Sequence, residues 1–218
     1  AFSKKSWRPL ETMLFNSLEF MLVFLPVTFF GFLMAVRHSR ALGLGWLVCA
    51  SLFFYGWWDP VYVWLIVGSM VVNYSLGWVL CRKRSVYVLS SGVGLNLATL
   101  GYYKYIGLFS KTLGQLASAQ MGFQDVVLPL AISFFTFQQI SYLVDAYNGK
   151  VDVSNWVEYA LFVTFFPQLI AGPIVRHSEI MPQFLKGQLG PREKDIAIGV
   201  SVFAVGLFKK VLIADTMA

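Results

Sequence analysis

The feature that most constrains this chain is a series of long apolar runs that are separated by short polar breaks. The first four runs are Leu18–Val36, Ala41–Trp58, Val61–Leu80 and Val86–Tyr103, and Glu19 is the only charged residue within them. A helix of about 20 apolar residues crosses the roughly 30 Å hydrocarbon layer of a bilayer. The runs therefore predict an all-α integral membrane protein, a polytopic bundle of transmembrane helices whose solvent is the lipid bilayer.

The composition agrees with a membrane protein and excludes a nucleic-acid-binding protein. Hydrophobic residues make up 57% of the 218 residues and charged residues only 13%, which a water-facing surface does not show. The net charge of +6 arises from basic residues in short clusters between the apolar runs. Such clusters attract lipid headgroups, so no nucleic-acid partner is expected.

The distribution of basic residues predicts the orientation of the chain. Basic residues follow the first and third runs, namely Arg37, Arg40, Arg82, Lys83 and Arg84. The turn between the second and third runs has a single charged residue, the acidic Asp59. The positive-inside rule places the basic loops in the cytoplasm. We expect residues 1–12 to be a polar basic extension and residues 13–218 to form part of a single membrane domain.

The run Val126–Tyr147 differs from the others because polar side chains lie at its centre, among them Gln138 and Gln139. Polar groups at membrane depth cost free energy unless they are paired or face a cavity, so this helix is predicted to face the protein interior. Two interpretations remain open, the wall of a tunnel or site and polar contacts that hold helices together.

The segment Trp156–Val175 predicts a broken or re-entrant helix. Pro167, Gly172 and Pro173 interrupt its helical hydrogen bonding. Interrupted backbone at membrane depth persists only where protein or a water-filled cavity satisfies it. The last apolar run, Ile196–Ala214, carries Lys209 and Lys210 near its end.

Candidate catalytic residues are few. His38 lies in a short loop between two arginines, and His177 follows the interrupted helix without a carboxylate at a spacing that could orient it. Asp145 is compatible with a cation or proton site and with an interfacial cap. The two cysteines, Cys49 and Cys81, have no metal-binding spacing and are interpreted as buried thiols, so no metal site is predicted.

Several local strings occur in an order that is similar to one family. They are Met13–Ser17, Ser51–Pro60, Leu100–Tyr105, Leu128–Gln138 with Ile140–Tyr142 and Asp145, Phe166–Arg176, and Gly206–Val211. Together they cover essentially residues 13–218, and the chain resembles the bacterial alginate O-acetylase branch of the membrane-bound O-acyltransferase family.

The resemblance implies transfer of an acyl group from a cytoplasmic donor to a hydroxyl of a cell-surface polysaccharide such as alginate. Family members are much longer, and their acyltransferase histidine lies in a second half that this chain lacks, so no catalytic residue is assigned here and the chain alone is expected to be inactive. A histidine acting as general base is the mechanism expected of the whole protein. The positions expected to line or border the acyl pathway are Gln138, Gln139, Gln168, Arg176 and His177.

The same resemblance implies the molecules around the chain. The donor is expected to be acetyl-CoA or an acyl-carrier thioester on the cytoplasmic side, with no covalently bound cofactor. A periplasmic or extracellular acetyltransferase partner and a polysaccharide acceptor are expected at the bacterial inner membrane. The alternatives are a polytopic transporter or channel, and a noncatalytic membrane subunit.

Overall fold

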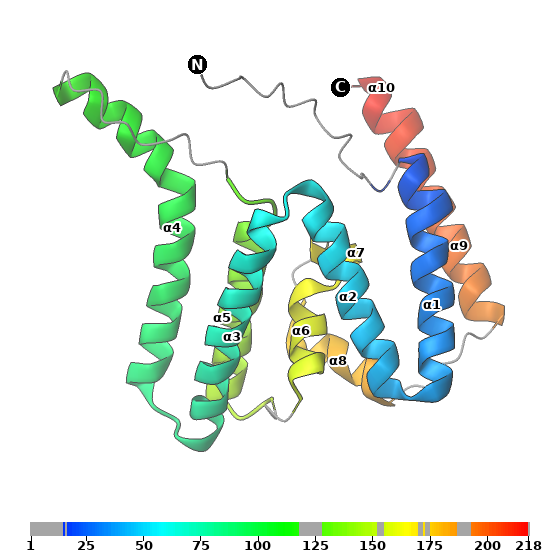
Figure 1. Cartoon of the computed structure of the whole chain (residues 1–218), viewed down its shortest axis with the longest axis horizontal. Coiled ribbons are helices and arrows are strands. Elements are labelled where there is room, and N and C mark those ends of the chain that lie inside the picture. The colour runs from blue at the N-terminus through cyan, green and yellow to red at the C-terminus, as the bar shows by residue number, and fades with distance from the viewer. Residues whose placement is uncertain are drawn as a thin grey trace, which may run out of the picture. The chain divides into compact units, whose positions relative to one another are not determined.

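The computed structural model describes residues 15, 17–117, 128–151, 155–169, 172, 175–186 and 193–217, and these residues form helices and turns without a strand (Figure 1). The elements are η1 (Phe20–Phe24, a π-helix), α1 (Leu25–His38), α2 (Arg40–Trp58), α3 (Val61–Arg82), α4 (Val86–Ala117), α5 (Ile132–Tyr147), α6 (Trp156–Thr164), α7 (Phe166–Leu169), α8 (His177–Lys186), α9 (Glu193–Phe208), η2 (Lys209–Ala214, a π-helix) and α10 (Asp215–Met217). The predicted all-α class is confirmed. The predicted extension 1–12 lies outside the described residues.

Four helical segments of the described chain are long and apolar enough to cross a membrane. They are Phe20–His38, Arg40–Trp58, Val61–Arg82 and Lys194–Ala214. Each agrees within a few residues with a run predicted from the sequence. In the most apolar stretch of each segment, only 0% to 39% of the residues are buried within the protein. Apolar side chains that the protein leaves uncovered suit lipid as solvent, and the chain is a multi-pass membrane protein.

The other two long runs form helices with different limits from those predicted. Helix α4 does not end near Tyr103 but continues to Ala117, and its polar residues keep it out of the most apolar set. Helix α5 begins only at Ile132, because Ala131 has a left-handed backbone conformation (φ 60°) that a right-handed helix cannot include. With 16 residues, α5 extends about 24 Å, less than a bilayer core.

The contacts of the chain divide it into two compact units. The smaller unit comprises residues 1–47 and 187–218, and the larger unit comprises Val48–Lys186. Within the smaller unit, the indole Nε1 of Trp46 donates to the carbonyl of Thr28 at 3.0 Å. The Trp46 ring occupies the space that a side chain at Gly31 would need, so this glycine permits the close approach of α1 and α2.

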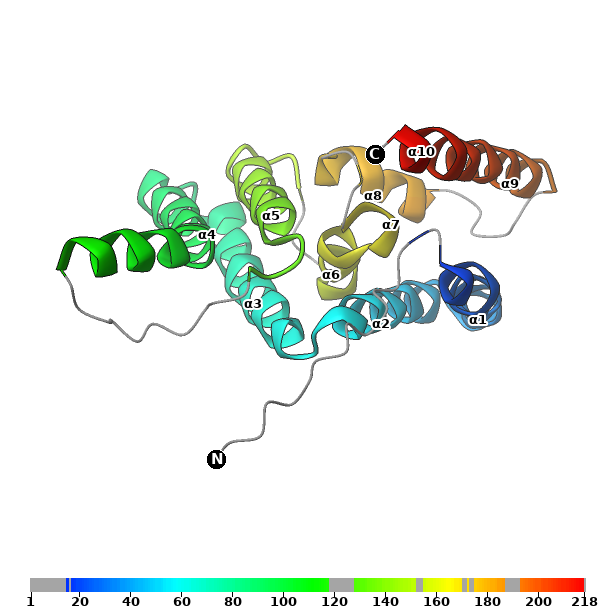
Figure 2. The same cartoon turned by 90° about the horizontal axis from the view of Figure 1, so that it is seen from above.

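The larger unit is built around α5. This helix packs against α3 and α4 on one side and against α6 and α8 on another, and Figures 1 and 2 show it behind α3 in one view and between α4 and α6 in the other. Its residues Phe135, Tyr142 and Leu143 are almost completely buried and belong to the hydrophobic core with Tyr159 of α6. Because α5 contacts four helices, its side chains form a large part of the interior of this unit.

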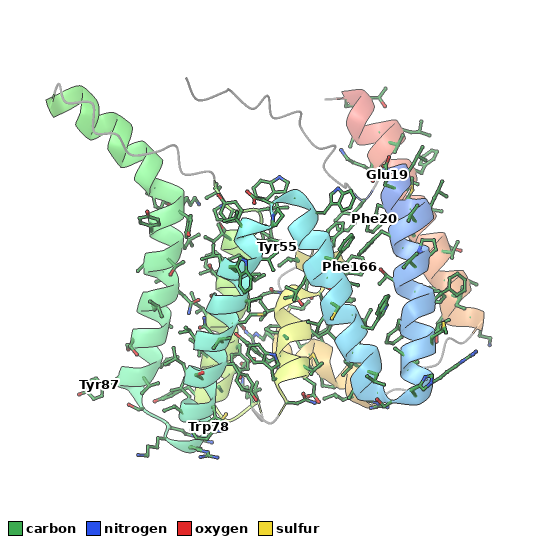
Figure 3. All side chains as sticks on the ribbon, viewed as in Figure 1. Glu19, Phe20, Tyr55, Trp78, Tyr87 and Phe166 are labelled. Atoms are coloured by element: carbon green, nitrogen blue, oxygen red, sulfur yellow. The ribbon has the colours of Figure 1, made fainter. Side chains whose placement is uncertain are left out.

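The interrupted segment predicted around Pro167 is confirmed as a broken helix. Helix α6 ends at Thr164, Phe165 leaves the helical conformation (φ −49°, ψ 108°), and α7 starts at Phe166. Pro167 thus falls in the first turn of α7, where a missing N–H costs nothing. The backbone amide of Phe166 donates to Ser51 Oγ of α2 at 3.2 Å, and Figure 3 shows Phe166 beside α2. The break is therefore satisfied by protein rather than by lipid.

The interpretation of both cysteines as buried thiols is wrong. Cys49 and Cys81 are exposed, although each lies inside an apolar run. In a membrane protein the outer surface is apolar too, so an apolar neighbourhood in the sequence does not imply burial within the protein.

We predict that Gly172→Ala destabilises the broken-helix region. The amide of Gly172 bonds to the carbonyl of Gln168 at 3.0 Å, and an added Cβ would lie 2.5 Å from the Cα of Gln168, a backbone atom that cannot move away cheaply. Overpacking of this kind costs about 1–3 kcal/mol of unfolding free energy. Thermal unfolding of the purified protein in detergent measures the effect.

The matched control for this prediction is Gly94→Ala in α4. Nothing lies within 4 Å of the Cβ position there, and alanine is a better helix former by about 1 kcal/mol, so this variant should be as stable as the wild type or more so. Equal melting temperatures for Gly172→Ala and Gly94→Ala would contradict the close contact described here.

Candidate functional site

The five side chains predicted to line an acyl pathway all lie in the larger unit, but they do not form one cluster. Gln138 and Gln139 are successive residues of α5, Gln168 lies in α7, Arg176 directly precedes α8, and His177 is the first residue of α8. Successive residues of a helix point about 100° apart. Gln138 and Gln139 consequently belong to different faces of α5.

Gln139 belongs to a buried amide cluster that joins three helices. Its Oε1 accepts hydrogen bonds from Asn73 Nδ2 at 2.5 Å and Ser69 Oγ at 2.6 Å, both on α3. Asn96 of α4 exchanges two hydrogen bonds with Asn73, at 2.6 and 3.2 Å. With Asn73 and Gln139 at 2% and 0% exposure, the cluster is buried, and it holds α3, α4 and α5 together. For Gln139, polar contact between helices is the role that the geometry supports.

Asn73 and Asn96 were not predicted from the sequence as candidate site residues. The signal was present, since each is a single amide within an apolar run, where an unpaired polar side chain is costly. What the sequence does not show is their pairing, because the two residues are 23 positions apart and meet only when α3 and α4 pack side by side.

Gln138 starts a second polar stripe on α5, which continues with Tyr142 and Asp145 at positions i+4 and i+7. All three side chains are at least 96% buried. Gln138 Oε1, the Tyr142 hydroxyl and Asp145 Oδ2 make no hydrogen bond within the described residues, and the same holds for the Tyr159 hydroxyl opposite. Buried polar atoms are nearly always paired in native proteins, so the unpaired atoms of this stripe mark a candidate functional surface. The Nε2 of Gln139, on another face of α5, also has no partner among the described residues.

His177 packs against this second stripe. Its ring lies 5.7 Å from the ring of Tyr142 and 5.1 Å from that of Phe162, in an edge-to-face arrangement with the latter. Burial lowers the pKa of His177 to about 4, so the imidazole is neutral at neutral pH. A neutral ring can accept or donate a proton through a nitrogen but offers no positive charge to an anionic donor.

Gln168 and Arg176 lie in α7 and directly before α8. Gln168 is buried in α7, next to the break after α6, and Arg176 is exposed at the start of α8, where its carbonyl accepts the amide of Glu179 at 3.0 Å. Their assignment to an acyl pathway stays a prediction.

The described residues hold no assembled catalytic centre of a familiar kind. No group of three His, Cys, Asp or Glu side chains among them could hold a metal ion. His177 has aromatic neighbours and no recorded bond to a carboxylate that would orient its ring. What these helices provide is a buried polar wall with a neutral histidine beside it.

Comparison with known proteins gives a consistent match. Residues 96–218 match the model of MBOAT, the membrane-bound O-acyltransferase family. The chain is 40% identical over 240 residues to a peptidoglycan O-acetyltransferase of Helicobacter pylori, covering 94% of this chain and 45% of that protein. It is 36% identical to a probable alginate O-acetylase, AlgI, of Pseudomonas aeruginosa, covering 94% and 41%. A probable AlgI of Azotobacter vinelandii is 35% identical, covering 94% and 42%.

The chain thus spans less than half the length of each of these relatives. No solved structure matches it.

We predict that Asn73→Leu weakens the packing of α3, α4 and α5. Leucine keeps the branching at Cγ but leaves the amides of Asn96 and Gln139 without their shared partner, and a buried unpaired polar group costs about 1–3 kcal/mol. Thr99→Val is the control, because Thr99 Oγ1 bonds only to the carbonyl of Leu95 in its own helix. Melting in detergent should separate the two variants, and equal melting temperatures would refute the structural role of the cluster.

We also predict that His177 makes the folded protein sensitive to acid. The unfolded chain binds a proton at its ordinary pKa of 6.5 and the folded protein only near 4. Stability is therefore complete above pH 6.5 and is lost as the pH falls from 6.5 toward 4, by about 2 kcal/mol at pH 5. Melting temperatures at pH 7 and pH 5 measure this loss. His177→Gln should reduce it, whereas the same change at the exposed His38 should leave it intact; equal losses in both variants would show that other groups are responsible.

Proposed function

The chain belongs to the membrane-bound O-acyltransferase family, and we propose that it forms the front part of an enzyme that O-acetylates a cell-surface polysaccharide. One observation carries the proposal, namely that acetyltransferases named for two different polysaccharides align with 94% of the chain. Relatives that share a reaction but differ in acceptor suggest that this part of the protein serves the common chemistry. Because the chain belongs to this family, we propose an acyltransferase rather than the transporter or channel considered from the sequence.

The acceptor is proposed to be a carbohydrate hydroxyl of peptidoglycan or of an exopolysaccharide such as alginate. Identities of 40% and 36% to the two kinds of relative are too similar to separate these acceptors. Both acceptors present sugar hydroxyls outside the cytoplasmic membrane, which agrees with a multi-pass protein that reaches both faces of the inner membrane. A second acetyltransferase on the outer side is the proposed partner.

The proposed reaction moves an acetyl group from a thioester to a hydroxyl. The acyl carbon–sulfur bond breaks, a carbon–oxygen ester bond forms, and the hydroxyl proton moves through a base to the leaving thiolate. The donor is proposed to be acetyl-CoA or an acyl-carrier thioester in the cytoplasm. In line with the family resemblance, the base is proposed to lie outside this chain.

The proposed contribution of this chain is to shape the path along which the acyl group reaches the acceptor. The stripe of Gln138, Tyr142 and Asp145 supports this role, since each of these buried side chains has a polar atom without a partner among the described residues, and the Tyr142 ring lies beside Tyr159 of α6 and His177 of α8. Gln139 lies on the other face and contributes through the amide cluster instead. Gln168, Arg176 and His177 are proposed to border the same path.

We predict that deletion of the gene removes ester-linked acetate from one cell-surface polysaccharide. Alkali-released acetate is measured separately in purified peptidoglycan and in exopolysaccharide, and the fraction that loses acetate identifies the acceptor. The intact gene should restore the acetate in a complemented strain. Unchanged acetate in both fractions would contradict the acetyltransferase proposal.

Complementation with point variants tests the polar stripe within the same experiment. Gln138→Leu removes a buried polar side chain from the proposed path and should restore much less acetate than the wild type at equal protein abundance. Phe137→Leu is the matched control, because Phe137 directly precedes Gln138 but its side chain is 47% exposed. Full restoration by both variants would exclude Gln138 from the reaction path without affecting the broader proposal.

A further inference from the structure

A groove lies between α3 and α4, with a volume of about 270 Å³. Its lining residues are Trp64, Leu65, Gly68, Ser69, Val72 and Asn73 of α3, with Leu95, Asn96 and Thr99 of α4. The absence of a side chain at Gly68 helps to create the hollow, since nothing lies within 4 Å of the position that its Cβ would occupy. None of the described contacts of the chain fills this space.

The chemistry of the lining suits an apolar occupant. None of the lining residues is charged, and the walls are formed largely by Trp64, Leu65, Val72 and Leu95. The amides of Asn73 and Asn96 at one end are already bonded to each other and to neighbouring groups. An occupant therefore does not need polar atoms to satisfy this end of the groove.

The dimensions match one leaflet of a bilayer. Trp64 and Asn73 are nine residues apart on α3, so the groove extends about 14 Å along that helix, close to half of a roughly 30 Å hydrocarbon core. Trp64 is 79% exposed and lies one turn from the α2–α3 connection. Trp58, Tyr62 and Tyr103 form successive ring contacts at the same end, the arrangement expected at a headgroup interface.

We propose that this groove binds one acyl chain of a bilayer phospholipid, in the leaflet next to the α2–α3 connection. The acyl chain of the lipid enters the groove beside Trp64 and ends at the amide cluster near the middle of the membrane. The bound lipid is independent of the acyl donor and of the acetyl transfer proposed above.

The test uses phosphatidylethanolamine that carries a photoactivatable diazirine in its acyl chain. The protein is reconstituted into vesicles that contain this lipid and irradiated, and mass spectrometry of its peptides locates the adducts. The wild type should carry adducts on groove residues of α3 and α4. Adducts on α9, whose apolar side chains are exposed around the helix, serve as an internal control for lipid contact.

Two glycine variants give the discriminating comparison. Gly68→Leu fills the groove and should lose the groove adducts while keeping those on α9. Gly94→Leu makes the same change in α4, also into open space but outside the groove lining, and should keep both sets. Val72→Phe fills the groove from another position and should reproduce the loss if Gly68→Leu disturbs folding.

Three results would overturn the proposal. The first is a wild type without groove adducts, and the second is equal labelling of the groove in wild type, Gly68→Leu and Val72→Phe. The third is crosslinking of groove residues to another polypeptide instead of lipid, which would make the groove a contact between protein segments. Loss of the groove adducts with unchanged acetylation would support the lipid site alone.

Discussion

The larger unit depends on one constraint, that polar side chains at membrane depth must find partners within the protein. Ser69 and Asn73 of α3, Asn96 of α4 and the carbonyl oxygen of Gln139 of α5 meet this constraint by bonding to one another. Water cannot replace these bonds in hydrocarbon, so helices that carry such residues are stable only side by side. The cluster thereby holds α3, α4 and α5 side by side.

The two polar faces of α5 consequently differ in character. One face carries the amide cluster, in which Gln139 uses its carbonyl oxygen, while its Nε2 has no partner among the described residues. The other face carries Gln138, Tyr142 and Asp145, whose buried polar atoms lack partners among the described residues. The broken helix brings α8 to this second face, and the ring of His177 lies against Tyr142. This division agrees with a helix that serves both architecture and the path of a substrate.

The break between α6 and α7 shows how well local chemistry could be predicted. Pro167 predicted an interruption, and the structure has one at Phe165, directly before the turn that contains the proline. Its satisfaction by Ser51 could not be predicted, since that residue is 115 positions away. The exposure of Cys49 and Cys81 was not predicted either. In lipid, an apolar sequence describes the inside and the outside of the bundle alike.

The sequence by itself determined the helical class, the approximate limits of four membrane-spanning helices, the broken helix and the family, because each of these follows from local hydropathy, backbone chemistry or ordered motifs. Tertiary structure alone decided which polar side chains meet. Gln138 and Gln139 are neighbours in the chain yet lie on different faces of α5. Asn73 and Asn96 bond to each other, and Asn73 to Gln139, only because the helices pack side by side. Pairing between distant residues depends on how helices are placed side by side, and that placement is a property of the whole fold rather than of any local segment.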